Sequence, residues 1–105
     1  MIKIYQSTLE DSSLQVIDAI TPGTWINVTD PTIEEVEELS LKVQIDTEFL
    51  NYILDEDEIP RTDTGKDKHL VVIDVPTKKR IRNHTLVTTT PLTIMTVRDE
   101  YIITF

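Results

Sequence analysis

The chain contains no cysteine, which excludes disulfides, thiolate metal sites and cysteine nucleophiles together. Its only two glycines, Gly23 and Gly65, lie outside any glycine-rich motif, which excludes a phosphate-cradling loop. The longest apolar run, residues 70–73, has strand length, far below the roughly 18 apolar residues that a membrane helix needs. The N-terminus, MIKIYQST, lacks the apolar segment and cleavage site of a signal peptide. These absences favour a soluble globular class.

The charge of the chain is acidic and unevenly distributed. Of the net −9, residues 1–45 and residues 46–67 each carry −6, whereas residues 68–105 carry +3. An acidic chain without a basic stripe is a poor nucleic-acid binder, because neutralisation of phosphates drives such binding. We therefore expect cations or basic partners, and no nucleic acid.

The first part of the chain predicts three short strands and a helix. Alternation and turn residues place the strands over residues 1–5, 14–17 and 25–28. Asp30 predicts the N-cap of the helix and Pro31 its first residue, since proline has no amide to leave unsatisfied there. The apolar residues at helical spacing, predicted to be its buried stripe, are Ile33, Val36, Leu39 and Val43.

A second helix of about two turns is predicted to begin at Asp46 and to end before Pro60. Its predicted buried side consists of Phe49, Leu50, Ile53 and Leu54. A polar loop over residues 61–68 and a basic turn over residues 76–83 are predicted, with Pro91 as a break between strands. The predicted strands cover residues 70–75, 85–90, 92–97 and 101–105.

The order β-β-β-α-α-β-β-β-β predicts one α+β domain of residues 1–105. We expect a mixed β-sheet with the two short-to-medium helices packed on one face. In the strand of residues 70–75, Val71, Ile73 and Val75 make one face wholly apolar. The other face, with Leu70, Val72 and Asp74, implies partial cover.

Four consecutive acids, residues 55–58, follow the second helix at the negative end of its dipole. Their mutual repulsion requires water, Arg61 or a cation, but the spacing and the glycine of a calcium loop are missing. A solvated turn is one interpretation. The other is a weak Mg²⁺ site of Asp55, Asp57 and Glu58 completed by another subunit, because Mg²⁺ keeps its waters and needs only one or two carboxylates.

The sequence does not predict an enzyme. If the strands of residues 70–75 and 85–90 pair around a turn, His69 and His84 lie at opposite ends, roughly 23 Å apart at about 3.3 Å per residue. No Ser–His–Asp or HExxH pattern is present. A hydrolase that uses the acids at 55–58 with a histidine is therefore the least favoured hypothesis.

The basic turn holds Lys78, Lys79, Arg80 and Arg82. It has two interpretations, a solvated turn or a contact with an acidic surface on a neighbouring subunit, as electrostatic complementarity favours. Membrane headgroups would require more basic residues than these.

Four motifs occur in order along residues 24–105. They are WINVTDP at residues 25–31, LNYILDEDEIPR at residues 50–61, TPLTI at residues 90–94 and DEYIIT at residues 99–104. As an ordered set, separated by a glutamate-rich helix, they resemble the N-terminal cytosolic domain of the CorA-like magnesium transporter family. The family's acidic pair in a Leu-Glu-Asp-Ile-Leu run is Asn51 and Tyr52 here.

This resemblance implies a pentameric divalent-cation channel on the cytoplasmic side of the cell membrane, with this chain as a regulatory, magnesium-sensing part. It also implies two C-terminal membrane helices with a Gly-Met-Asn signature, which this chain lacks, so the chain itself would not conduct. The last predicted strand runs to Phe105, from which we expect a longer parent chain. The alternative hypothesis is a soluble regulatory or protein-interaction module without an ion role.

Overall fold

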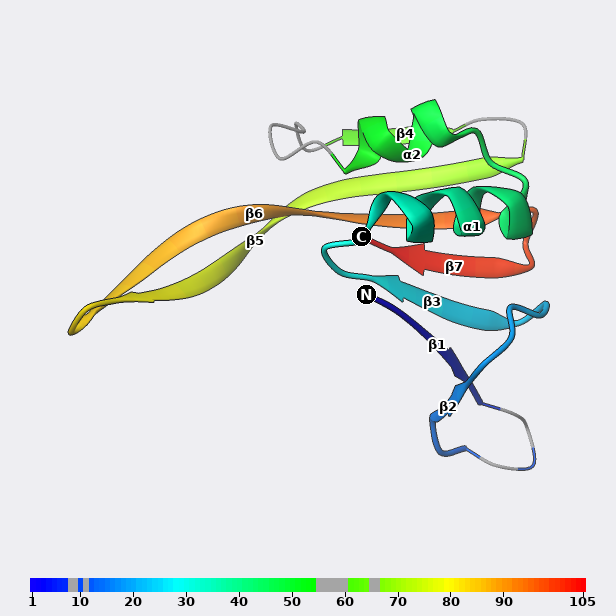
Figure 1. The fold of residues 1–105 in the computed structure, drawn as a ribbon, viewed down its shortest axis with the longest axis horizontal. Helices are drawn as coiled ribbons and strands as arrows, with labels where there is room; N and C mark the ends of the chain where they lie inside the picture. Colours follow the sequence, from blue (N-terminus) through cyan, green and yellow to red (C-terminus); the bar gives the residue numbers. More distant parts are fainter. Residues whose placement is uncertain (8–9, 11, 55–60, 65–66) are drawn as a thin grey trace.

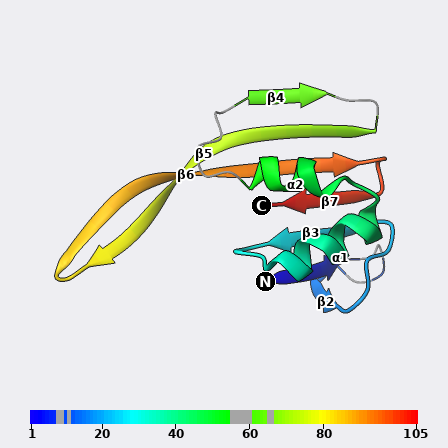
Figure 2. The same ribbon diagram turned by 45° about the horizontal axis from the view of Figure 1, so that its top comes forward.

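The computed structural model describes residues 1–7, 10, 12–54, 61–64 and 67–105. A seven-stranded sheet carries two helices over one of its faces (Figures 1 and 2). In chain order the elements are β1 (Ile2–Gln6), β2 (Gln15–Ile17), β3 (Thr24–Val28), α1 (Ile33–Val43), α2 (Thr47–Ile53), β4 (Arg61–Thr64), β5 (Lys68–Ile81), β6 (His84–Val97) and β7 (Tyr101–Thr104). Across the sheet the order is β2-β1-β3-β7-β6-β5-β4, and only the pair β3–β7 is parallel among these strands. The predicted α+β class, mixed sheet and order of elements are confirmed.

The core lies between the helices and one row of paired strand residues. Ile4 faces Ile26, Ile26 faces Ile103, Ile103 faces Met95 and Met95 faces Leu70 across five strands, and all are buried. Side chains alternate along a strand, so this register turns the whole row toward α1 and α2. The buried residues that the helices and their connection add are Val36, Leu39, Val43, Ile45, Leu50 and Ile53.

Helix α1 begins two residues later than predicted. Its N-cap is Thr32, whose hydroxyl accepts from the Glu35 N–H while the Glu35 carboxylate accepts from the Thr32 N–H. This reciprocal capping box satisfies two helix-end donors, which explains why Thr32 and not Asp30 caps the helix. The predicted burial of Ile33 is wrong, since it is 76% exposed. Ile33 lies about 120° around the helix axis from Leu39, at the edge of the buried stripe.

Two predicted interruptions of the sheet are wrong. The predicted loop over residues 61–68 contains β4, which pairs with β5, and β6 runs without a break through Pro91. Pro91 precedes the part of β6 that pairs with β7, Ile94–Val97, so on one side it has no strand partner. Proline is tolerated at such an edge because its missing N–H costs no ladder bond there.

The buried face of β5 is the one that carries Leu70 and Val72. The wholly apolar face is the outer one, and Val71 and Ile73 are 39% and 40% exposed there. The strand register determines which face of β5 is buried, because Leu70 and Val72 lie opposite the buried Met95 and Thr93.

Strands β5 and β6 continue past the other strands as a two-stranded arm, which we define as residues 76–89 (Figure 1). The rest of the described chain is the body. The predicted turn over residues 76–83 is shorter than expected, since Ile81 pairs with His84 and only Arg82 and Asn83 form the turn. The arm lengthens the molecule: its radius of gyration is 15.1 Å, against about 13 Å for a compact chain of this size.

Candidate functional site

Helix α2 fixes the point from which the predicted metal-binding segment starts. Asp46 is its N-cap residue as predicted, and Leu50 and Ile53 are buried against the sheet. The Lys68 ammonium lies 4.4 Å from the centre of the Phe49 ring, a cation–π contact that connects α2 to β5. Helix α2 is therefore held on the body by its buried residues and by this contact.

The predicted metal ligands Asp55, Asp57 and Glu58 lie outside the described residues. Their role stays a prediction. Within the described residues, no group of three or more histidine, aspartate or glutamate side chains is placed to hold a metal ion. Tyr52, which stands where the CorA-like motif has an acid, is 57% exposed on α2.

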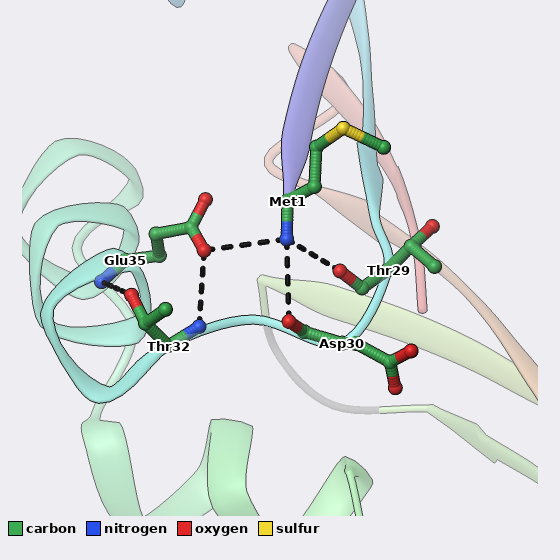
Figure 3. Close-up of polar contacts among 5 residues, drawn as sticks. All are labelled: Met1, Thr29, Asp30, Thr32 and Glu35. Carbon is green, nitrogen blue, oxygen red and sulfur yellow. Dashed lines mark hydrogen bonds and ion pairs between the residues drawn. The ribbon is translucent and has the colours of Figure 1, made fainter.

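The N-terminus and the start of α1 form a compact polar corner (Figure 3). The Met1 ammonium lies 3.2 Å from the Glu35 carboxylate and donates to the backbone carbonyls of Thr29 and Asp30. The Thr32 N–H donates to Glu35 at 3.0 Å. This backbone donor, together with the ammonium, lowers the pKa of Glu35 from its ordinary value. The corner connects β1 to the helix through one carboxylate.

A groove of about 970 Å³ lies between the start of α1, helix α2, the end of β3 and the base of the arm. Its apolar wall includes Val36, Ile53 and Leu92, and its carboxylates are Asp30 and Glu37. Leu54, the last described residue before the acidic segment, also lines the groove. The groove is lined from residues 27–37, 47–54 and 75–105, so three parts of the chain meet at it.

The two histidines are farther apart than the sequence predicts. His69 lies opposite Thr96 in the body, whereas His84 lies opposite Ile81 at the tip of the arm. From His69 to Ile81 along β5 the distance is roughly 40 Å at about 3.3 Å per residue. The prediction that they share no site is confirmed, although the predicted register, with Pro76 opposite His84, is wrong.

The basic residues Lys78, Lys79, Arg80 and Arg82 are all exposed on the arm. None of them forms an ion pair with another described residue. Their exposure agrees with both interpretations of the basic turn, and the contact with a neighbouring subunit stays a prediction.

Two polar contacts in the body were not predicted from the sequence. Arg98 donates to the Val43 carbonyl at 2.8 Å, at the negative end of α1. On the outer face, the Trp25 indole donates to the Thr104 hydroxyl at 2.9 Å, and that hydroxyl donates to the Asn27 side chain at 2.9 Å. Arg98 follows a strand in a turn of positive φ, a conformation that no sequence pattern here signals.

The α+β domain with its mixed sheet and two helices on one face is similar to two solved structures of CorA. The structure of the soluble domain of CorA from Methanocaldococcus jannaschii matches 99% of this chain and 39% of that chain, with a TM-score of 0.76 and 29% identity. The complete structure of the CorA magnesium transporter from the same organism matches 99% of this chain and 31% of that one, with a TM-score of 0.77 and 26% identity.

The sequence comparison agrees with the structural one. The cobalt/magnesium transport protein CorA of M. jannaschii is 40% identical over 52 residues, which are 50% of this chain and 16% of that protein. No family model matches the chain. The chain thus spans less than a sixth of the curated relative in sequence and about a third of the complete CorA chain in structure.

These matches confirm the CorA-like resemblance that the four sequence motifs predict. Neither helix of the described residues is long and apolar enough to cross a membrane.

Proposed function

We propose that this chain is the N-terminal cytosolic, regulatory portion of a CorA-like magnesium or divalent-cation transport protein, on the cytoplasmic side of the cell membrane. The observation that carries the proposal is the match of 99% of the chain to CorA at a TM-score of 0.77 and 26% identity. Because the chain corresponds to 31% of that protein, we propose no conduction by these residues themselves. Conduction would belong to C-terminal membrane helices of a longer protein.

Self-association is the second part of the proposal, with a pentamer as the expected state of the full-length protein. The outer face of the sheet supports it, because Val71, Ile73 and Ile102 are between 39% and 48% exposed there. Apolar side chains gathered on an exposed sheet face are typical of interaction surfaces.

Magnesium sensing is the third part. We propose that Asp55, Asp57 and Glu58 bind Mg²⁺ weakly between subunits. The motif position supports this assignment, since these acids directly follow the buried end of α2. Loss of the ion would leave carboxylates of facing subunits unpaired, and their repulsion would shift the population away from the ion-bound arrangement.

A magnesium titration of the 105-residue chain tests the sensing role. We expect the amide resonances of residues 55–58 to shift at about 10 mM Mg²⁺, and no shift in the variant D55N/D57N/E58Q. The matched control is E10Q/D18N/D99N, which removes three exposed carboxylates away from α1 and from residues 76–89 and should keep the response. Sodium chloride at equal ionic strength separates ion binding from screening.

Two results would contradict the sensing role. One is the absence of any shift at residues 55–58 under conditions where the chain self-associates, and the other is an unchanged response in D55N/D57N/E58Q. Either result would favour the alternative, a protein-interaction module without an ion role.

A further inference from the structure

The arm extends beyond the other described elements of its own subunit (Figure 1). Of its residues only Thr77 and Thr88 are half-buried, and every other one is exposed. Its large apolar side chains Ile81, Leu86 and Val87 are 54%, 49% and 61% exposed. A two-stranded hairpin alone in water is only marginally stable, so apolar side chains on both of its faces indicate a contact that completes it.

The arm differs in charge from all the rest of the chain. It holds four cations, Lys78, Lys79, Arg80 and Arg82, and no acid. All 19 acids lie elsewhere, which leaves the remainder of the chain with a net charge of −13. A second copy of this chain therefore presents a body of opposite charge to the arm, and such complementarity steers association and fixes its register.

Helix α1 offers the matching chemistry on the body. Ile33 and Leu41 are 76% and 81% exposed, and Glu37 lies between them at the same helical spacing. The exposed Glu34 and Glu38 flank this line, which spans about 12 Å at 1.5 Å per residue. Apolar side chains separated by carboxylates are the counterpart of the arm.

One face of the arm has the complementary pattern. Lys79 lies opposite Leu86 and Ile81 lies opposite His84, so these four side chains share a face. On this face of the arm, apolar side chains alternate with basic ones. On the exposed line of α1, apolar side chains alternate with acidic ones.

The arm cannot make this contact within its own subunit. Figures 1 and 2 show its tip pointing away from the body along the long axis, while α1 lies over the body. No arm cation is ion-paired to a described residue.

We propose that the arm of one copy docks on the exposed face of α1 of a second copy, with Ile81 and Leu86 against Ile33 and Leu41 and Lys79 against the α1 carboxylates. Lys78 and Arg80, on the other face of the hairpin, add to the positive charge of the arm. The proposal rests on the self-association in the proposed function, and it names the surfaces that would make it. It does not depend on magnesium binding.

Charge reversal tests the contact in the full 105-residue chain by analytical ultracentrifugation. We expect K78E/K79E/R80E in the arm, and separately E34K/E37K/E38K in α1, to weaken self-association at least about tenfold. In a mixture of the two variants, the arm of each variant has a charge opposite to that of the other variant's α1, so a heterodimer should form that neither variant forms alone. Association of the unaltered chain should also weaken in about 1 M salt.

Cross-linking locates the contact, because the chain has no cysteine of its own. A mixture of the variants L86C and L41C should give a heterodimer with a short bis-maleimide linker. The control pair is V16C with L41C, since Val16 is 67% exposed on β2, outside the proposed surface. It should give only background.

Three results would overturn the proposal. They are a chain that stays monomeric, self-association unchanged by arm reversal, and cross-linking of L86C no better than of V16C. Unchanged association would leave the proposed function intact and assign self-association to another surface. Loss of binding to phosphatidylserine vesicles in K78E/K79E/R80E, with self-association unchanged, would assign the arm to a membrane instead.

Discussion

Strands β5 and β6 run through both the body and the arm, yet the same alternation of residues gives the two regions different properties. In the body, Leu70 and Met95 of β5 and β6 are buried under the helices. In the arm, Lys79 and Leu86 of the same strands face each other in solvent. Strand pairing alone therefore does not make a core. The body and the arm differ because helices cover the paired strands in the body and neither described helix covers them in the arm (Figure 1). The body supplies stability, and the arm supplies a surface.

The largest expected difference between the two regions is in the cost of truncating an apolar side chain. Ile26→Ala should lower the free energy of unfolding by about 2–5 kcal/mol, because it leaves a cavity in the fully buried row. Val87→Ala in the arm should change it by less than about 0.5 kcal/mol. Urea unfolding of both variants at low protein concentration measures this. Similar losses in both would mean that the arm is part of the core.

A smaller effect is expected at the helix cap. Thr32→Ala removes the hydroxyl that accepts from the Glu35 N–H, and should cost about 1 kcal/mol. Thr32→Ser keeps the acceptor and should cost less. In the arm, Thr77→Ala removes hydroxyl contacts with Thr88 and Thr90, and it should cost less than Thr32→Ala. Thermal unfolding measures the stability of the three variants. A loss of stability in Thr77→Ala equal to that in Thr32→Ala would contradict the distinction between body and arm.

The smallest expected effect is a pH dependence in the body. The pKa of Glu35 is lowered in the folded chain, so its contribution is present above the unfolded-state pKa and is lost as pH falls through the folded-state pKa. The difference in unfolding free energy between the unaltered chain and Glu35→Gln should therefore shrink on acidification from about pH 7 to pH 3. Glu37→Gln, an exposed carboxylate on the same helix, serves as the control. A difference that grows toward low pH would contradict the assignment.

Much of the fold follows from local patterns. Period-2 alternation located β1, and helical spacing located α1 and α2, because these patterns reflect burial on one face. Turn residues before them marked the starts of β3 and β7. The extent of β5 and β6 did not follow, since Pro76 and Pro91 are typical breakers that a strand tolerates only where it lacks a neighbour on one side. Strand neighbours are a property of the tertiary structure, and no local window contains them.

Less of the candidate site could be predicted. The exposed cations of the arm were expected as a group, but not on a strand and turn that extend beyond the body. The corner of Met1, Thr32 and Glu35 joins residues that are distant in sequence through an amino group that no motif marks. The prediction at Asp55, Asp57 and Glu58 rests on the sequence and on the CorA-like motif.

Amide hydrogen exchange of the 105-residue chain, followed over a range of protein concentrations, tests most directly the central claim that the arm becomes ordered by contact with a second copy. We expect the row from Ile4 to Leu70 to be protected at every concentration. Amides of the arm and of α1 should both gain protection as the protein concentration rises. The variant K78E/K79E/R80E should abolish this gain. An arm as protected as the body at the lowest concentration, or one that gains no protection at the highest, would contradict the account.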